Sequence, residues 1–218
     1  MPVKLNLYWT VIPDKTQEYD KYILKKFIPG VNQLGLHTVA VWSVLVGAYS
    51  EIMFECVTSD LDLLEKALKD KKYKELKANL LNYIKKYKSK VLVKTGKKDS
   101  YSTDISEDTM KFNQTWDLVG DKKEYGHFVK NEFYPLLEEL GICVAREWEV
   151  LIGDGPSIIC EGRANDISSL LRNLQGNKFQ EAKLKLKQFV ENYESRILTF
   201  HIRKVKGYKS ASYRIISH

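Results

Sequence analysis

The chain begins with alternating apolar and polar positions, the period of a strand that has one buried face. The apolar positions are Leu5, Leu7, Trp9 and Val11. From residue 19 to residue 34 the apolar residues instead follow a helical period, which predicts an amphipathic helix. Pro29 lies inside this helix, so we expect a kink or a break one turn before it, and Gly35 is suited to a left-handed cap.

Two β-rich runs follow, at residues 37–47 and 51–58, and the turn residues 47–50 between them predict an antiparallel hairpin. Asp60 can cap a second helical region, whose apolar spacing continues to Tyr87. Residues 91–93 are predicted to form a last strand. The order strand, helix, strand, strand, helix, strand is the ferredoxin-like split β-α-β topology.

This pattern occurs twice in the chain. A shift of 106 positions superposes residues of the same type, and only the first strand needs an offset of 107. The matched pairs include Trp42 and Trp148, Gly47 and Gly153, Glu55 and Glu161, Asp60 and Asp166, and Tyr87 and Tyr193. We therefore expect a first repeat at residues 1–98, a linker at 99–109, a second repeat at 110–206 and a basic C-terminal tail at 207–218. The tail could add an edge strand, stay disordered or contact a partner.

Each predicted sheet has helices on one face and a second face that needs a cover. The other repeat is the most economical cover. The expected fold is therefore α+β, with two ferredoxin-like β-α-β-β-α-β repeats whose antiparallel sheets pack face to face within one chain. Sheet edges could still support a further homo-oligomer.

The topology, the repeat length and a glycine-containing hairpin followed by a glutamate (Gly47 to Glu55, Gly153 to Glu161) resemble the dimeric α/β barrel superfamily. This superfamily includes NIPSNAP-like proteins, antibiotic-biosynthesis-type monooxygenases and muconolactone isomerases. The resemblance covers nearly the whole chain and implies an intrachain dimeric α/β barrel. It also implies a ligand site between each sheet's open face and its helices or partner. Its members suggest cofactor-free oxygenation, isomerisation or haem handling, so the cofactor stays unknown.

Glu55 and Glu161 are the candidate catalytic residues. Each lies in the middle of a largely apolar predicted strand, where a carboxylate could serve as a general acid or base. The alternative is a glutamate at the sheet rim, or one paired with a lysine or with Arg146 or Arg163, because matched residues of a duplication usually preserve structure. If only one copy is active, we expect the second, which carries more ionisable groups on its strands.

The candidate ligand-binding residues are mainly aromatic. Large rings on inner strands could line a pocket for an apolar or aromatic ligand, although such rings can equally belong to the core. His37 is included because haem-binding and monooxygenase members of the superfamily use a histidine near the barrel mouth. The full set is Trp9, Trp42, Trp116, Trp148, Tyr8, His37 and Arg146.

The composition, with 44% hydrophobic and 29% charged residues, is that of a globular protein. The net charge of +7 would suit nucleic acid, and the RNA-recognition motif has the same strand order. However, the third strands lack the basic and aromatic pattern of that motif and carry glutamates instead, which argues against a nucleic-acid partner. Three dispersed cysteines, and histidines without ligand spacing, predict neither a disulfide framework nor a metal site.

No apolar run approaches the length of a membrane span, and the N-terminus lacks the features of a signal peptide, so we expect a cytoplasmic protein with no membrane partner. The leading hypothesis is a small-molecule-binding protein that could be a cofactor-independent oxygenase or isomerase acting on an apolar or aromatic ligand. The alternative is a non-catalytic structural or protein-interaction module. The sequence does not decide whether the protein is an enzyme.

Overall fold

The computed structural model describes residues 1–47, 52–99, 106–206 and 211–216. The hairpin turn expected at residues 47–50 and the linker expected at 99–109 therefore lie largely outside the described residues.

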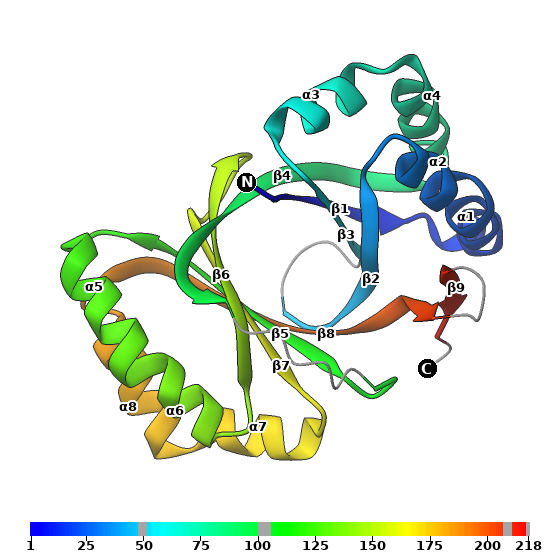
Figure 1. The fold of residues 1–218 in the computed structure, drawn as a ribbon. Coiled ribbons are helices and arrows are strands. Elements are labelled where there is room, and N and C mark those ends of the chain that lie inside the picture. Colours follow the sequence, from blue (N-terminus) through cyan, green and yellow to red (C-terminus); the bar gives the residue numbers. More distant parts are fainter. Residues whose placement is uncertain (48–51, 100–105, 207–210, 217–218) are drawn as a thin grey trace. The chain divides into compact units, whose positions relative to one another are not determined.

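The first repeat follows the predicted order of elements (Figure 1). A strand is followed by a helix in three parts, by a hairpin, by two short helices and by a long last strand. The elements are β1 Val3–Val11, a 3-10 turn Pro13–Lys15, α1 Thr16–Tyr22, a π-helical turn Ile23–Phe27, α2 Ile28–Gln33, β2 His37–Val46, β3 Ile52–Thr58, α3 Leu61–Lys69, α4 Lys71–Leu80 and β4 Ile84–Asp99.

The second repeat has the same order and one additional strand. Its elements are β5 Met110–Leu118, α5 Lys122–Phe128, a π-helical turn Val129–Phe133, α6 Tyr134–Glu139, β6 Cys143–Ile152, β7 Ile158–Ala164, α7 Ile167–Gln175, α8 Asn177–Leu186, β8 Val190–Lys206 and β9 Ala211–Ile215. The additional strand, β9, pairs antiparallel with β8, so the described part of the tail forms an edge strand.

The strand pairing confirms the ferredoxin-like topology of both repeats. In the first, β1 lies between β3 and β4, and β2 pairs with β3, all antiparallel. In the second, β5 lies between β7 and β8, and β6 pairs with β7. The complete hydrogen-bonded order is β2-β3-β1-β4-β6-β7-β5-β8-β9, and β2 also pairs with β8. The α+β class predicted from the sequence is therefore correct.

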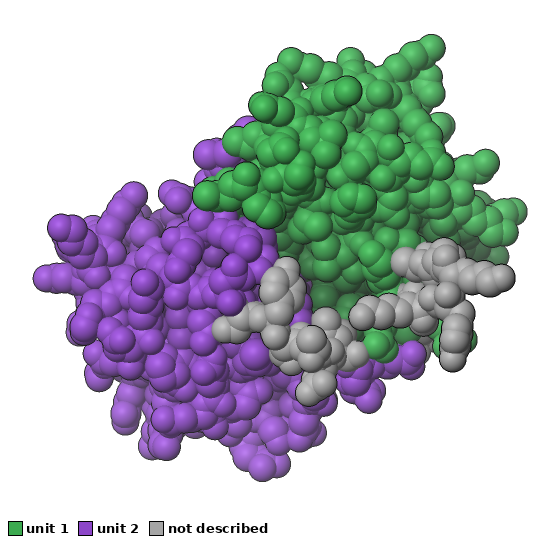
Figure 2. Space-filling view, in the orientation of Figure 1, with its two compact units in different colours: residues 1–44, 48–93, 200–218 green, residues 45–47, 94–199 purple. Residues whose placement is uncertain are grey.

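The chain divides into two compact units, which Figure 2 shows in different colours. Unit 1 contains residues 1–44, 48–93 and 200–218, and unit 2 contains residues 45–47 and 94–199. The unit boundaries therefore fall inside strands. Strand β4 begins in unit 1 and ends in unit 2, and β8 begins in unit 2 and ends in unit 1.

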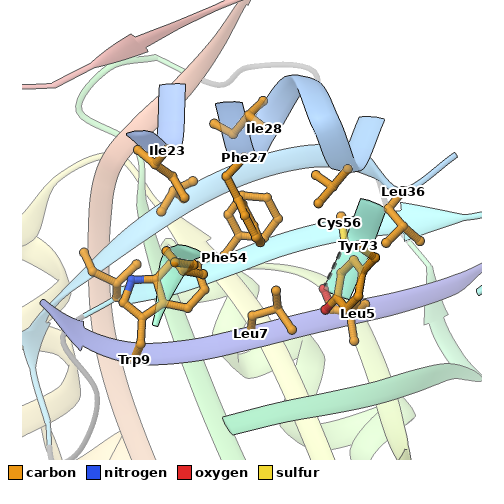
Figure 3. Close-up of a cluster of buried hydrophobic side chains, with 14 of the residues drawn as sticks. Leu5, Leu7, Trp9, Ile23, Phe27, Ile28, Leu36, Phe54, Cys56 and Tyr73 are labelled. Carbon is orange, nitrogen blue, oxygen red and sulfur yellow. Dashed lines mark hydrogen bonds between the residues drawn. The ribbon is translucent and has the colours of Figure 1, made fainter. Parts of the chain in front are cut away.

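In each unit the helices cover one face of the sheet, and the main core lies between helices and sheet (Figure 1). The alternation read from the sequence produces this core, because every second residue of β1 points towards the helices. Figure 3 shows Leu5, Leu7 and Trp9 of β1 packed with Phe27 and Phe54. The residues between them, such as Asn6, point to the opposite face of the sheet.

The break expected before Pro29 is present as the π-helical turn Ile23–Phe27. Proline has no N–H to donate, and its ring crowds the carbonyl one turn earlier, so the preceding turn widens. The second repeat has the turn Val129–Phe133 in the same place before Pro135. Gly35, with a φ of 81°, ends the first helix in the left-handed conformation that was expected.

The second helical region is shorter than the sequence predicts. It ends at Leu80, and β4 already begins at Ile84. Lys86 has a φ of 55°, and the pairing of β1 with β4 shifts register beside it, which marks a β-bulge. The extra residue turns Ile84 and Tyr87 towards the same core although they are three positions apart. The bulge thus imitates a helical period, and Asn192, with a φ of 52°, repeats it in the second copy.

Both predicted aspartate caps are present. Asp60 Oδ1 accepts a hydrogen bond from the backbone N–H of Leu63 at 2.8 Å, and Asp166 Oδ1 accepts from those of Ser168 and Ser169 at 2.9 and 3.3 Å. These bonds satisfy N–H groups that have no partner within the helix. The hydroxyl of Ser169, followed by the two backbone N–H groups, lowers the pKa of Asp166.

The cap of α7 therefore predicts a pH dependence of stability. A lowered pKa in the folded protein contributes stability above the unfolded pKa, and this contribution is lost as the pH falls through the folded pKa. Asp166→Asn keeps an acceptor but does not titrate, so its free energy of unfolding should fall less than that of the wild type on acidification. Urea denaturation across the acidic range measures this difference, and Asp60→Asn should behave alike. Parallel curves for wild type and variants would contradict the prediction.

Candidate functional site

Strand alternation places the predicted tryptophans on two different faces. Trp9 and Trp116 point towards the helices and are 0% exposed. The indole N–H of Trp9 donates to the hydroxyl of Tyr19, and that of Trp116 to the hydroxyl of Tyr125, each at 3.1 Å. Both rings are thus held in the cores between helices and sheet.

The opposite face of the sheet in unit 1 carries a buried ion pair. Lys4 Nζ lies 2.7 Å from Glu55 Oε1, and both side chains are less than 5% exposed. The indole N–H of Trp42 donates to Glu55 Oε2 at 2.9 Å. The ring of Trp42 in turn stacks on Phe200, with 4.0 Å between ring centroids. Each carboxylate oxygen of Glu55 therefore already accepts a donor.

Unit 2 repeats the ion pair and the indole hydrogen bond. Lys111 Nζ lies 2.7 Å from Glu161 Oε1, and the indole N–H of Trp148 donates to Glu161 Oε2 at 2.8 Å. We call these two groups the Lys–Glu–Trp triads. The structure thus brings each predicted glutamate together with one predicted tryptophan and with a lysine, the pairing that the sequence left open as the alternative. Both copies contain the triad, so it is part of the architecture that the two repeats have in common.

Arg146 distinguishes the triad of unit 2. Its guanidinium lies over the Trp148 ring, 5.0 Å from the centroid, and forms an ion pair with Asp99. Hydrogen bonds from Lys94 and then from Arg146 lower the pKa of Asp99. The matched residue of the first copy is Ala40, so this cation is specific to unit 2.

The two remaining predicted residues lie apart from each other. The Tyr8 side chain is on the triad face of β1, where its hydroxyl accepts a hydrogen bond from Asn6 Nδ2 at 3.1 Å. His37 is the exposed first residue of β2. It pairs in register with Val57, so it lies at the exposed margin of the sheet face that carries Glu55.

The described histidines do not suit a haem, which needs an axial ligand inside a closed, largely apolar pocket. His37 and His127 are exposed, and His127 lies 3.1 Å from Asn131. His201 is in contact with Asp20 at 3.2 Å and stacks on Tyr19. Within the described ranges, no three His, Cys, Asp or Glu side chains gather as a metal site.

A second polar group, which sequence reasoning did not assemble, lies in the helix-side core of unit 2. Glu147 of β6, Cys160 of β7 and Gln114 of β5 are register partners, so they form one transverse row on the face that the helices cover. All three residues are 0% exposed. We call them the polar row.

The first copy has an entirely apolar row in the same place. Its register partners are Val41 of β2, Phe54 of β3 and Leu7 of β1, all in the core of unit 1. Between the two copies, two of these strands have thus exchanged an apolar core residue for a polar one, and the strand between them has exchanged a phenyl ring for a thiol. Comparing the aligned repeats at their core positions could have revealed the polar row from the sequence.

Glu147 is the centre of a dense set of hydrogen bonds. Its Oε2 accepts from the hydroxyl of Tyr125 at 2.7 Å and also from the hydroxyl of Tyr134. Its Oε1 lies 2.9 Å from Lys97 Nζ. We call Glu147, Tyr125 and Tyr134 the Glu147 cluster. The first copy has Ile28 in place of Tyr134.

The two tyrosines and the cysteine near Glu147 remain protonated at neutral pH. Burial, and after it the negative charge of Glu147, raises the pKa of Tyr125 far above its usual range. Burial likewise raises the pKa of Tyr134 and that of the Cys160 thiol. Both phenols therefore act as donors to the carboxylate at neutral pH.

Gln114, at the other end of the polar row, is only half satisfied. Its Oε1 accepts a hydrogen bond from the hydroxyl of Tyr193 at 2.8 Å. Its Nε2 is buried and has no acceptor among the described residues. Buried donors are nearly always paired in folded proteins, so such a group marks a place for a water molecule or a ligand.

A groove of about 280 Å³ opens on the outer side of the same core. Its apolar lining consists of Phe128, Phe133, Leu136 and Ala182, and its rim carries Glu132, Glu181, Lys178 and Lys185. The ring of Phe133 also packs on Trp116 and Tyr134, with 6.3 and 6.1 Å between centroids. Phe133 therefore separates the groove from residues that contact Glu147 and Tyr125.

Comparison with known proteins finds similar structures but no similar sequences. No protein-family model matches the sequence, and neither does any curated protein. A candidate monooxygenase from Fusobacterium nucleatum subsp. nucleatum ATCC 25586 aligns over 99% of this chain and 98% of its own, with a TM-score of 0.62 and 13% identity. A candidate monooxygenase from Lactobacillus acidophilus NCFM aligns over 99% of both chains, with a TM-score of 0.59 and 11% identity.

A mutant chlorite dismutase from Candidatus Nitrospira defluvii aligns over 91% of both chains, with a TM-score of 0.61 and 8% identity. No helix in the described part of this chain is long and apolar enough to cross a membrane. Identities this low establish the fold alone. The chain has the ferredoxin-like dimeric α/β barrel fold, as its repeats predicted.

Proposed function

We propose that this protein binds a small molecule in the helix-side core of unit 2, at the polar row and the Glu147 cluster. The observation that carries the proposal is the difference between the copies, in which Val41, Phe54 and Leu7 correspond to Glu147, Cys160 and Gln114. The triads, which both copies share, need no explanation beyond a common architecture. A feature that is present in only one copy calls for a function that belongs to that copy.

Stability does not account for the polar row. Burying an ionised carboxylate costs several kcal/mol before its partners compensate, and well-packed apolar side chains in its place are often about 1–4 kcal/mol more stable. Unit 1 shows that the fold accepts such side chains. The buried Gln114 Nε2 adds a donor that a ligand could satisfy. These costs support a binding role.

The Glu147 cluster also has the parts for acid–base chemistry without a cofactor. A phenol or an enolisable carbon acid could give a proton to Tyr134 as Tyr134 passes its own proton to Glu147. The resulting anion could take a proton back at another carbon, as in an isomerisation, or react with dioxygen as co-substrate. The similarity to candidate monooxygenases supports the second route. An apolar or aromatic ligand would suit the rings of Trp116 and Phe133 around the site.

The proposal is tested by giving unit 2 the core of unit 1. In the variant Gln114→Leu/Tyr134→Ile/Glu147→Val/Cys160→Phe, each residue becomes its counterpart in the first copy. We expect the free energy of unfolding to rise by about 1–4 kcal/mol and ligand binding to be lost. Urea denaturation measures the first effect. Titration calorimetry with compounds retained in native mass spectra of the purified protein measures the second.

A matched control changes the corresponding row of unit 1 without adding polarity, as in Val41→Ile/Phe54→Leu, and should bind ligand like the wild type. If the fourfold variant does not fold, Glu147→Gln alone serves, since it removes the charge and keeps the shape. Unchanged ligand binding in these unit 2 variants would overturn the proposal. It would favour the alternative of a non-catalytic structural module.

A further inference from the structure

Lys97 reaches the Glu147 cluster from outside it. Its side chain is 20% exposed, whereas the Glu147 side chain is fully buried. It belongs to the last residues of β4, directly after Gly96, whose φ is 76°. The ammonium group is thus carried on an extended segment and inserted into the helix-side core of unit 2.

The surroundings of this ammonium group form a recognition site for an alkyl cation. Nζ lies 2.9 Å from Glu147 Oε1 and 5.0 Å from the centroid of the Tyr125 ring. A carboxylate and an aromatic face are the two groups that bind organic ammonium ions in proteins. Gly126 lines the slot for the alkyl stem, since a Cβ there would lie 3.5 Å from Lys97 Cε.

Electrostatics restricts what could take the place of Lys97. A buried carboxylate without a counter-charge is strongly unfavourable, and the two phenols supply hydrogen bonds but no charge. A neutral or anionic ligand would therefore have to leave Lys97 where it is. A protonated amine could replace the ammonium group without leaving Glu147 uncompensated.

We propose that the Glu147 cluster recognises an alkylammonium group, and that Lys97 occupies this place until a ligand amine displaces it. This inference rests on the proposed function, because it names the chemical class of the ligand for the same site. The substrate class is then an apolar or aromatic compound that carries a protonated amine.

The experiment removes the internal amine and offers a free one. Lys97→Ala retains Cβ, and n-propylammonium supplies the missing three carbons and the nitrogen. We expect the variant to lose roughly 5–10 °C in Tm. We also expect n-propylammonium at about 10 mM, which is on the order of the effective concentration of a tethered group, to restore most of this loss. The dissociation constant of the amine should be about tenfold lower for Lys97→Ala than for the wild type, in which Lys97 competes.

Three controls separate charge from space. n-Propanol has the same length without the charge and should restore nothing. Lys97→Met fills the slot with an uncharged chain, so the amine should not stabilise it. Lys97→Ala/Glu147→Gln has the slot but no carboxylate and should not respond either. Equal rescue by n-propanol, or none by n-propylammonium, would overturn the inference.

If Lys97→Ala does not fold, saturation-transfer NMR of n-propylammonium with the wild type and with Glu147→Gln replaces the rescue, and equal signals from both would count against the inference. The two proposals fail separately. Loss of ligand binding in the fourfold variant, without any response to the amine, would refute the amine class and leave the binding site in place. An amine response with unchanged ligand binding in the fourfold variant would refute the proposed function.

Discussion

Replacing Lys4 with methionine is expected to lower the free energy of unfolding by about 3–5 kcal/mol, the cost of breaking a buried ion pair by removing one partner. Lys4 and Glu55 are both buried, and their charged atoms lie 2.7 Å apart. Methionine keeps the length of the side chain but removes its charge. The carboxylate then loses the ammonium group that offsets its burial. Urea denaturation at neutral pH measures the change.

The partner substitution shows whether charge is the cause. Lys4→Met/Glu55→Gln should recover part of the loss, because no uncompensated carboxylate remains. The triad of unit 2 offers a matched comparison, and Lys111→Met should behave like Lys4→Met. A loss below about 1 kcal/mol, the range of exposed ion pairs, would show that the lysine is dispensable.

Truncating the two buried tryptophans should also have large and unequal effects. Trp9→Ala and Trp116→Ala each leave a cavity in a packed core, which costs about 3–5 kcal/mol. Without Trp9, the buried hydroxyl of Tyr19 has no other hydrogen-bond partner in the described part of the chain. Without Trp116, the hydroxyl of Tyr125 still donates to Glu147. Trp9→Ala should therefore be the more destabilising by about 1 kcal/mol.

Thermal and urea unfolding of both variants measure this difference. In the double variant Trp9→Ala/Tyr19→Phe this additional destabilisation should disappear, because the unsatisfied hydroxyl is then absent. Equal losses for the two tryptophan variants would mean that the Tyr125–Glu147 bond gives the second copy no protection.

The sequence predicts the fold well because the patterns that indicate each helix and strand occur twice. The strand alternation, the aspartate caps and the proline inside the first helix occur in both copies, so each copy checks the other. The sequence predicts a second helical region that is too long, because a β-bulge places Ile84 and Tyr87 at a helical spacing. A local pattern cannot reveal such a bulge, since its register shift is defined by the partner strand.

The candidate site was only partly readable. Glu55 and Trp42 were each singled out, but their hydrogen bond joins neighbouring strands, and the pairing register that brings them together is not a property of either strand alone. The polar row was missed for the opposite reason. It is absent from the residues that the two copies share, because the first copy has Val41 and Leu7 in place of Glu147 and Gln114.

The division of β4 and β8 between the units has a consequence for synthesis on the ribosome. Domains usually complete their folding in the order in which they are made, beginning at the N-terminus. Here unit 1 includes residues 200–218, which are translated after residues 94–199, the main segment of unit 2. Unit 1, most of which is translated before unit 2, must therefore wait for residues 200–218 before it is complete.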